Sequence, residues 1–358
     1  MDSLKCPITC ELLRDPVIGS DGHTYERESI TLWLQQHGTS PLTREPMVIE
    51  SLRPNHSIRQ MIDEFAVISQ KNEYQFRLNV DVRKTETRPW FKVFNKSIYK
   101  AEWVQKQGPP IVLMKIEGAK ASREASFYVK FSCHPHIVRT YGLVETDPNS
   151  VMLVQEYAEN GDLGELLRED GCKPNRHVLI EIFTQIIDAM ICLADNKIVH
   201  GDLACRNVLV FRFDASDPEK NLVKLSDFGL TKVSDIFSVA TSTSQTTTII
   251  IPTRYCAPEV LRTNGDRTSY SEKSDVYSMG VLMWEACSYG ALPFSSVNDD
   301  NEVRRCKLRG DQLPRPAVCE NDLWSTILQC WKSPPSERPS FKELKRQIIR
   351  LAQASYST

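Results

Sequence analysis

Five polar residues in the middle of the chain are of the types, and in the order, that phosphoryl transfer needs. This reaction requires a lysine that binds phosphate, ligands for Mg²⁺, and a base beside the hydroxyl group that is phosphorylated. The five residues are Lys115, Glu124, Asp202, Asn207 and Asp227. A solvated surface charge is the alternative explanation for each residue alone, but it does not account for their order.

The elements expected around these residues form a small β-rich lobe followed by a larger helical lobe. Lys115 ends an apolar run, and Glu124 lies on the helix expected after it, so the two side chains are expected to pair. The expected strands are Phe91–Phe94, Ile111–Lys115 and Ser150–Gln155, and the expected helices are His177–Asn196, Ser274–Tyr289, Asp322–Trp331 and Lys342–Ala352.

From about Pro89 to Leu351 the sequence resembles protein kinases of the tyrosine-specific type. The stretch His200–Asn207, HGDLACRN, resembles their catalytic loop, whereas serine/threonine kinases carry a lysine two residues after the aspartate. The resemblance implies a bilobal kinase fold in which Arg338 pairs with Glu259. Further matching segments, in order, are Asp227–Gly229, Pro252–Cys256, Ala257–Glu259, Asp275, Trp284–Glu285, Cys330–Trp331 and Arg338–Phe341.

The resemblance also implies a role for each polar residue. Asp202 is expected to act as the base, and Lys115, paired with Glu124, is expected to bind phosphate. Asn207 and Asp227 are expected to hold Mg²⁺. The expected catalytic residues are Asp202, Arg206, Asn207, Lys115 and Glu124.

An ATP pocket between the lobes is implied in the same way. Gln155 is expected at its back, Glu156–Ala158 in the hinge, and Leu209 beneath the adenine. Leu113 stands where the family has a smaller residue, and it is expected to narrow the adenine slot from above. The expected ATP-binding residues are Lys115, Ile98, Leu113, Gln155, Glu156, Tyr157, Ala158, Leu209 and Asp227.

The phosphate-binding loop departs from the family pattern. Phe91, Val93 and Lys96 occupy the places of three glycines, whose backbone amides would otherwise approach the phosphates. Side chains at these places are expected to obstruct that approach. Lys92 and Lys96 carry charge there but are expected to be solvated.

A second departure concerns regulation. Gly201 replaces the arginine that grips a phosphorylated activation loop, and the segment 231–251 is rich in Ser and Thr but contains no tyrosine. Two interpretations therefore stay open. The domain is an active tyrosine or dual-specificity kinase that uses ATP and Mg²⁺, or it is a pseudokinase that binds substrates for, or regulates, the N-terminal block.

Residues 4–74 form that block, with two loops around a helix that is expected to begin near Glu26 and to end at His37-Gly38. This layout resembles a RING, which places four Cys or His ligands around each of its zinc ions. Hydrogen bonds and charge pairs are expected to hold the loops instead of zinc. The ligand candidates, at the wrong spacing for a RING, are Cys6, Cys10, His23, His37 and His56.

The same block resembles the zinc-free U-box family. The family implies a ubiquitin ligase that holds a charged ubiquitin-conjugating enzyme close to its protein substrate, and many members dimerise. The expected contacts with the conjugating enzyme are Ile8, Trp33, Pro41 and Arg44, and packing in the core is the alternative for Ile8 and Trp33. The matching motifs are Cys6–Ile8, Asp15–Val17, Gly22–Arg27, Ile30, Trp33–Leu34, Pro41–Thr43 and Leu52–His56.

Composition places the chain among globular proteins. Hydrophobic residues make up 41%, charged residues 25%, and the net charge is −2, so neither nucleic acid nor a membrane surface is an expected partner. The eleven cysteines predict reduced thiols in a cytoplasmic protein. We expect a mixed α+β chain with a U-box at 1–74, a polar linker at 75–88 and a kinase-like domain at 89–353.

Overall fold

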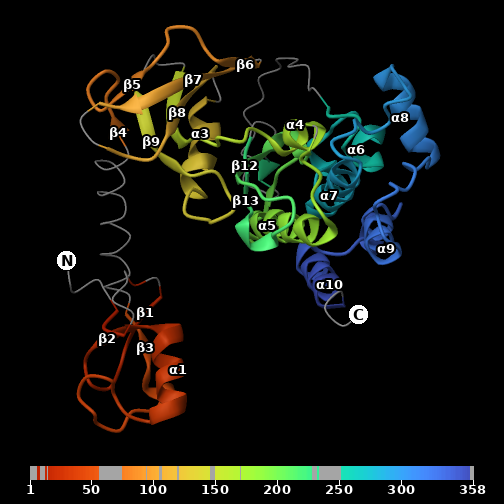
Figure 1. The fold of residues 1–358 in the computed structure, drawn as a ribbon. Coiled ribbons are helices and arrows are strands. Elements are labelled where there is room, and N and C mark those ends of the chain that lie inside the picture. The colour runs from red at the N-terminus through yellow and green to blue at the C-terminus, as the bar shows by residue number, and fades with distance from the viewer. Residues whose placement is uncertain are drawn as a thin grey trace. The chain divides into compact units, whose positions relative to one another are not determined.

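The chain divides into two compact units, Met1–Gln75 and Phe76–Thr358, and each is described by itself (Figure 1). The structure is a computed structural model. It describes residues 6–8, 13, 15–55, 75–93, 95–104, 107–118, 121–145, 150–169, 171–227, 232–233 and 251–354.

The N-terminal unit contains a three-stranded antiparallel sheet, in the order β2-β1-β3, beside one helix. Helix α1 follows β2 directly and ends at Gly38, whose φ of 64° is favourable for glycine. The predicted helix is thereby confirmed. The sequence also predicts a last helix with Ile58, Met61, Ile62 and Phe65, and these residues, like Cys10 and His56, lie outside the described residues. The elements are β1 (Pro16–Ile18), β2 (Thr24–Glu26), α1 (Arg27–His37), a 3₁₀ turn (Ile49–Ser51) and β3 (Arg53–Pro54).

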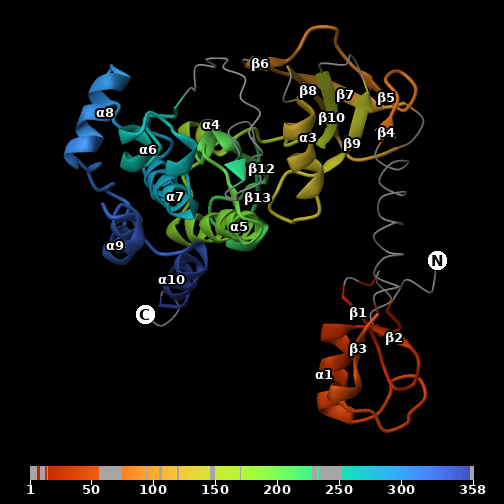
Figure 2. The same ribbon diagram turned by 180° about the vertical axis from the view of Figure 1, so that it is seen from behind.

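The larger unit begins with a lobe built on a seven-stranded sheet. Its strand order is β4-β9-β10-β8-β7-β5, with β6 paired to β7. Helix α3 packs on this sheet, as both views of the fold show (Figures 1 and 2). The elements are β4 (Gln75–Phe76), β5 (Val82–Lys84), β6 (Phe91–Val93), β7 (Lys96–Trp103), β8 (Ile111–Glu117), α3 (Ala121–Lys130), β9 (Thr140–Glu145) and β10 (Ser150–Glu156).

Both faces of this sheet are covered, and β8 is therefore buried on two sides. Met114 and Ile116 belong to the core cluster that contains the buried face of α3. Ile111 and Leu113 face the opposite way and belong to a separate cluster with Val82. We call these the α3 face and the outer face of the sheet.

The segment 75–88, predicted as a linker, contributes to the outer face instead. Strand β4 lies at one edge of the sheet and β5 at the other, so the residues between them cross the outer face. Phe76 and Leu78 pack against this outer cluster, and Val82 is fully buried within it. Its few apolar residues are spaced to suit a chain that crosses the sheet, and this spacing has neither helical nor strand periodicity. The sequence of the segment therefore resembled a polar linker.

The second lobe is mainly helical, as predicted. The predicted helices at 177–196, 274–289, 322–331 and 342–352 are confirmed within about two residues as α5, α7, α9 and α10. The elements are α4 (Leu163–Arg168), α5 (Arg176–Asp195), β11 (Ile198–Val199), a 3₁₀ turn (Cys205–Asn207), β12 (Val208–Arg212), a 3₁₀ turn (Pro218–Lys220), β13 (Leu222–Leu225), β14 (Lys232–Val233), α6 (Pro258–Arg262), a 3₁₀ turn (Arg267–Ser269), α7 (Glu272–Cys287), α8 (Asp300–Arg309), α9 (Asn321–Cys330), a 3₁₀ turn (Pro335–Glu337) and α10 (Phe341–Ala354).

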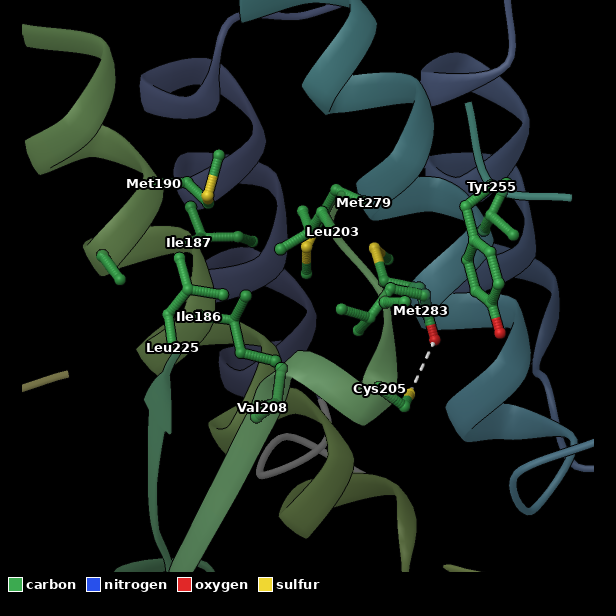
Figure 3. Packing of buried hydrophobic residues seen from close by; sticks show 14 of the residues in the cluster. Ile186, Ile187, Met190, Leu203, Cys205, Val208, Leu225, Tyr255, Met279 and Met283 are labelled. Atoms are coloured by element: carbon green, nitrogen blue, oxygen red, sulfur yellow. Dashed lines mark hydrogen bonds between the residues drawn. The ribbon is translucent and has the colours of Figure 1, made fainter. Parts of the chain in front are cut away.

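Helices α5 and α7 form the centre of this lobe. Figure 3 shows side chains of both helices gathered around Leu203 and Cys205, which lie in the segment between β11 and β12. Cys205 Sγ donates a hydrogen bond to the backbone oxygen of Leu282 on α7. The chain between β11 and β12 is thus anchored from below by the core.

Helix α5 is long and apolar enough, by composition alone, to span a membrane. Eleven of its residues are buried against the lobe, however, so its apolar surface is explained by the core of a globular domain. The ten cysteines that the structure describes carry free thiols, as predicted.

Candidate functional site

The loop that carries Asp202 is fixed by a buried carboxylate. Asp275 of α7 accepts hydrogen bonds from the backbone N–H groups of His200, at 2.7 Å, and Gly201, at 2.9 Å. Burial raises the pKa of Asp275 to about 6. Gly201 has a φ of 82°, a conformation that costs glycine little, so replacing the usual arginine removes a side chain without straining the loop.

Asp202 itself is held by two neighbours from the following 3₁₀ turn. Arg206 forms an ion pair with its Oδ1. Asn207 Nδ2 donates to the Asp202 backbone oxygen at 2.6 Å and to its Oδ2 at 3.0 Å. The carboxylate is therefore oriented before any substrate binds, as a general base must be.

Glu285 of α7 joins this loop to the segment that follows the activation loop. Its Oε2 accepts from the backbone N–H of Cys205 at 3.0 Å, and its Oε1 accepts from the Tyr255 hydroxyl at 3.0 Å. Arg206 lies over the Tyr255 ring, 4.7 Å from its centroid. The expected base and the expected substrate platform, Pro252–Cys256, thus share one support.

The two residues expected to hold Mg²⁺ lie on adjacent segments. Ser226, just before Asp227, donates its backbone N–H to the backbone oxygen of Asn207 at 2.8 Å. Asp227 has a φ of 60°, a strained value for a non-glycine residue of the kind that clusters at functional sites. Because Asn207 Nδ2 donates to Asp202, its Oδ1 is the amide atom that suits a cation.

The expected pair of Lys115 with Glu124 is wrong. Lys115 Nζ lies 2.7 Å from Glu117 Oε1, two residues further along β8. Side chains alternate along a strand, and Lys115 shares the outer face with Leu113 rather than the α3 face with Met114. Its side chain therefore leaves the sheet on the side opposite to Glu124.

Lys96 of β7 takes that place. Its Nζ lies 2.6 Å from Glu124 Oε1 and also forms an ion pair with Asp227. The side chains of Lys96 and Glu124 are only 14% and 11% exposed, so the expectation that Lys96 is solvated is wrong as well. The ion pair links α3, β7 and the end of β13.

Leu113 does not roof the expected adenine slot. It is fully buried in the outer cluster. The residue on the α3 face at that level is Val112, which pairs in register with Gln155 on β10 and with Lys100 on β7. The slot is therefore bordered by a valine, which is smaller than the predicted leucine.

The remaining ATP-binding candidates lie on β7, β10 and β12. Ile98 lies beside Met114 on the α3 face, opposite it in register. Gln155 is buried and donates to Thr140 Oγ1 at 3.1 Å. Leu209 forms an isolated bridge with Asp162 below the sheet lobe.

The hinge is braced from both lobes. Both carboxylate oxygens of Glu156 lie within 2.8 Å of Lys224 Nζ, which comes from β13. Tyr157 meets the Trp90 ring edge-on at 5.9 Å, and Ala158 is buried. The Glu156 side chain is therefore held by Lys224.

The sequence lacks the glycine-rich loop of the kinase family, and strands β6 and β7 form a tight hairpin in its place. Phe91 pairs with Ile98 and Val93 with Lys96. Phe91 is 58% exposed and, opposite Ile98, lies on the same side of the hairpin as the expected adenine site. Phe228, Gly229 and most of the segment 231–251 lie outside the described residues.

The predicted pair of Arg338 with Glu259 is confirmed. Arg338 Nη1 lies 2.6 Å from Oε1 of Glu259, and its Nη2 lies 2.9 Å from Oε2. The guanidinium, whose side chain is fully buried, also donates to backbone oxygens of Lys332, Lys273 and Ser333. This pair therefore attaches α6, which follows the segment Pro252–Cys256, to the loop between α9 and α10.

In the N-terminal unit, Asp21 ties the two loops together. Its Oδ2 accepts from the hydroxyls of Tyr25 and Ser40, each at 2.6 Å, and its Oδ1 accepts from the backbone N–H of His23 at 3.0 Å. Ser40 Oγ in turn accepts from the N–H groups of Leu42 and Thr43. Burial would raise the pKa of Asp21, but these hydrogen bonds lower it below its usual value, so the carboxylate stays ionised.

A second network holds the other end of the loops. The Glu26 carboxylate accepts from the backbone N–H of Asp15 at 3.1 Å, and Arg27 Nε lies 2.6 Å from Asp15 Oδ2. Cys6 Sγ accepts from the backbone N–H of Glu26 at 3.3 Å. Together the two networks supply the hydrogen bonds and charge pairs that the sequence was expected to use for loop closure.

We expect Asp21→Ala to destabilise the N-terminal unit by about 2–3 kcal/mol, because buried hydroxyls of Tyr25 and Ser40 would lose their acceptor. Hydrogen exchange of the intact chain should show faster exchange at the amides of residues 40–43. Glu45→Ala changes an exposed side chain on the same loop and is the matched control. Equal exchange in both variants would contradict this role for Asp21.

The candidate docking residues lie around these loops. Ile8 and Trp33 are partly buried against the core of the unit, and Trp33 Nε1 donates to Thr39 O at 2.9 Å. Pro41 is half-buried, and Arg44 is exposed with a φ of 65°. Ile8 and Trp33 therefore pack against the core and are also partly exposed. This agrees with packing in the core and leaves part of each side chain open to a contact with a conjugating enzyme.

Comparison with known protein families follows this division of the chain. Residues 97–348 match the family described as protein tyrosine and serine/threonine kinase, which is more than half of the chain. Residues 1–72 match the U-box domain. The chain belongs to the protein kinase family and carries an N-terminal U-box.

Proteins similar to the kinase domain include a kinase and two receptors. Ephrin type-A receptor 1 of Mus musculus is 35% identical over 232 residues, which cover 64% of this chain and 22% of the receptor. Activated Cdc42 kinase Ack of Drosophila melanogaster is 33% identical over 227 residues, 61% of this chain and 19% of that kinase. The BDNF/NT-3 growth factors receptor of Gallus gallus is 34% identical over 249 residues, 65% of this chain and 28% of the receptor. The match thus spans less than a third of each of these three relatives.

Sequence reasoning missed two residues of the kinase domain that the structure brings to the site. Lys96 was noted only as a filled glycine position, and Met114 was read as part of an apolar run. Only the register of the folded sheet, in which Gln155 pairs with Val112, shows which alternate residues of β8 face α3.

Proposed function

We propose that the chain is a U-box ubiquitin ligase fused to an active protein tyrosine kinase. The observation that carries the kinase half is the polar set around Asp202, in which the base is already oriented by Arg206 and Asn207. A charged lysine beside Glu124 and Asp227 completes the set. These groups match the parts that phosphoryl transfer requires.

The residues present fit ATP and its metal. Asn207 and Asp227 would hold Mg²⁺, which neutralises phosphate charge in such reactions. The adenine would lie between Ile98 and Val112 on one side and Leu209 on the other, beside the hinge backbone. Asp202 would accept the proton of the attacking hydroxyl.

Tyrosine specificity is favoured by Arg206, which contacts both the proposed base and the proposed substrate platform. Arg206 contacts both Asp202 and the Tyr255 ring, so the platform sits at a fixed height relative to the base. Because the tyrosine side chain is long, its hydroxyl reaches the base only when the platform holds the substrate backbone at a suitable distance from Asp202. The stretch HGDLACRN, which resembles the tyrosine-specific catalytic loop, agrees with this specificity.

A pseudokinase that regulates the U-box is the second candidate. The β6–β7 hairpin, with exposed Phe91 on the nucleotide side, favours it because no glycine lets the backbone approach a phosphate there. The two candidates predict different binding behaviour, which one assay separates.

The assay measures ATP binding by calorimetry with and without Mg²⁺, followed by phosphotyrosine formation on a tyrosine-containing peptide library. We expect Mg²⁺-dependent binding and phosphotyrosine. ATP binding without any phosphotyrosine would support the pseudokinase, and the absence of both would also reject the proposed kinase activity.

For the U-box we propose that Ile8, Pro41, Trp33 and Arg44 bind a ubiquitin-conjugating enzyme. Leu42, beside Pro41, is 48% exposed and extends the apolar part of this surface. The ligase would act by proximity, holding the charged enzyme near a protein substrate. Homodimerisation and a cytoplasmic location belong to this proposal as well.

Ile8→Ala is expected to reduce autoubiquitination of the intact chain about fivefold or more, since truncating a central apolar anchor commonly costs over about 1 kcal/mol of binding. Leu32→Ala, an exposed leucine of α1, is the matched control and should keep wild-type ubiquitination. Undiminished ubiquitin chains in Ile8→Ala would reject the docking surface.

A further inference from the structure

Resting on the proposed kinase activity, we propose that Lys96 of β7 is the lysine that binds the nucleotide phosphates, and that Met114 fills the corresponding place on β8. The lysine that the sequence seemed to offer for this role, Lys115, points away from the site. The nucleotide pocket is therefore built with its cation on a different strand.

Strand register carries the first step. On the α3 face of β8 the side chains are Val112, Met114 and Ile116, each opposite an α3-face residue of β7 or β10. Gln155, at the start of the hinge, pairs with Val112. A lysine of β8 that reached Glu124 would therefore have to stand at position 114, and that residue is methionine.

The second step is the reach of Lys96. It lies diagonally across from Met114 on the same face, since Lys96 pairs with Ile116 while Ile98 pairs with Met114. Diagonal neighbours in an antiparallel pair are about 7–8 Å apart, a distance that a lysine side chain spans. Its Nζ accordingly lies 2.6 Å from Glu124 Oε1.

Lys96 Nζ lies beside two carboxylates, those of Glu124 and Asp227, and 3.4 Å from the Tyr128 hydroxyl. The ammonium group is thus available to an anion next to Asp227, where the phosphates and their cation would lie. Lys92, which pairs with Ser97, is exposed and lies on the face of the hairpin opposite to that of Lys96.

The arrangement also explains how a loop without glycines could serve. A glycine-rich loop binds phosphate through backbone amides that approach closely. Here a side-chain ammonium at one of those positions supplies charge at a distance, so close approach of the backbone is less important. The alternative is that Lys96 only braces the two lobes by bridging Glu124 and Asp227.

Three variants of the intact chain separate these roles: Lys96→Met, Lys115→Met and the double variant Lys96→Met with Met114→Lys. Each is assayed for its ADP dissociation constant by calorimetry, for kcat and for KM of ATP with a peptide substrate, and for thermal unfolding without nucleotide. Lys96→Met should lower kcat/KM for ATP about 10²–10³-fold. Its ADP affinity should fall about tenfold.

Lys115→Met should stay within about twofold of wild type in both measurements, because its side chain lies on the outer face. The double variant returns a lysine to β8 on the α3 face and should recover at least tenfold in kcat/KM. A purely bracing lysine would change the unfolding temperature without changing ADP affinity or kcat/KM of the folded protein, and that result would overturn the inference.

The same variants distinguish this inference from the proposed function. A wild type that phosphorylates tyrosine while Lys96→Met matches it and Lys115→Met fails would overturn the role of Lys96 alone. A wild type that neither binds ADP nor phosphorylates peptides would overturn the proposed function, and the inference with it.

Discussion

Replacing Asp202 by asparagine is expected to lower kcat for phosphotyrosine formation by about 10²–10⁴-fold, the usual contribution of a general base. The amide has nearly the shape of the carboxylate but does not accept the proton of the tyrosine hydroxyl. Asp202 accepts from Arg206 and from Asn207 through its two carboxylate oxygens, whereas an asparagine offers one such oxygen. ADP affinity should stay within about threefold, because the pocket residues of both lobes are unchanged.

Asp195→Asn is the matched control for this substitution. Asp195 ends α5, is exposed, and pairs with Lys342, so its change from carboxylate to amide alters no residue of the candidate site. Steady-state kinetics on a tyrosine peptide and calorimetry with ADP provide the two readouts. If Asp202→Asn kept more than a tenth of the wild-type kcat, Asp202 would not be the base.

How much of the site could be read from the sequence depends on the element that carries each residue. The catalytic loop was predictable because its residues are neighbours in the chain, so Asp202, Arg206 and Asn207 meet within one short turn. The pair of Arg338 with Glu259 was predictable only through the family resemblance, since 79 residues separate them. The long helices were predictable because one of their faces is apolar over several turns.

The lysine that pairs with Glu124 could not be predicted in the same way. The run from Ile111 to Met114 is apolar at every position because the outer face of the sheet is covered by residues 76–82. A strand buried on both faces shows no alternation, so its sequence does not tell which residues face α3. Lys115 is the lysine at the end of the run, and a difference of one position along a strand places a side chain on the other face.

The loop networks of the U-box show the same limit in another form. That hydrogen bonds must close the loops followed from the missing zinc ligands. Which groups do so did not follow, because Asp21 and Ser40 meet only after α1 has folded between them. Polar residues in loops are common, and only their three-dimensional pairing distinguishes these two from solvated ones.

The second large effect is expected at Arg338. Its guanidinium is fully buried, forms two parallel contacts with Glu259 and donates to three backbone oxygens. Removing one member of a buried ion pair commonly costs about 3–5 kcal/mol, because the remaining charge is left without compensation. Arg338→Ala should therefore lower the unfolding temperature of the kinase domain by about 10 °C.

Differential scanning calorimetry of the intact chain measures this shift for the kinase domain. Arg338→Lys keeps the charge but not the planar fork, so it should lose part of the same stability. Arg305→Ala, which removes an exposed partner of Glu302, is the matched control and should change stability by less than about 1 kcal/mol. A shift in Arg338→Ala no larger than in Arg305→Ala would show that the pair contributes little. A large shift would mean that the buried pair holds Glu259, and with it the neighbouring segment Pro252–Cys256, in place in the folded domain.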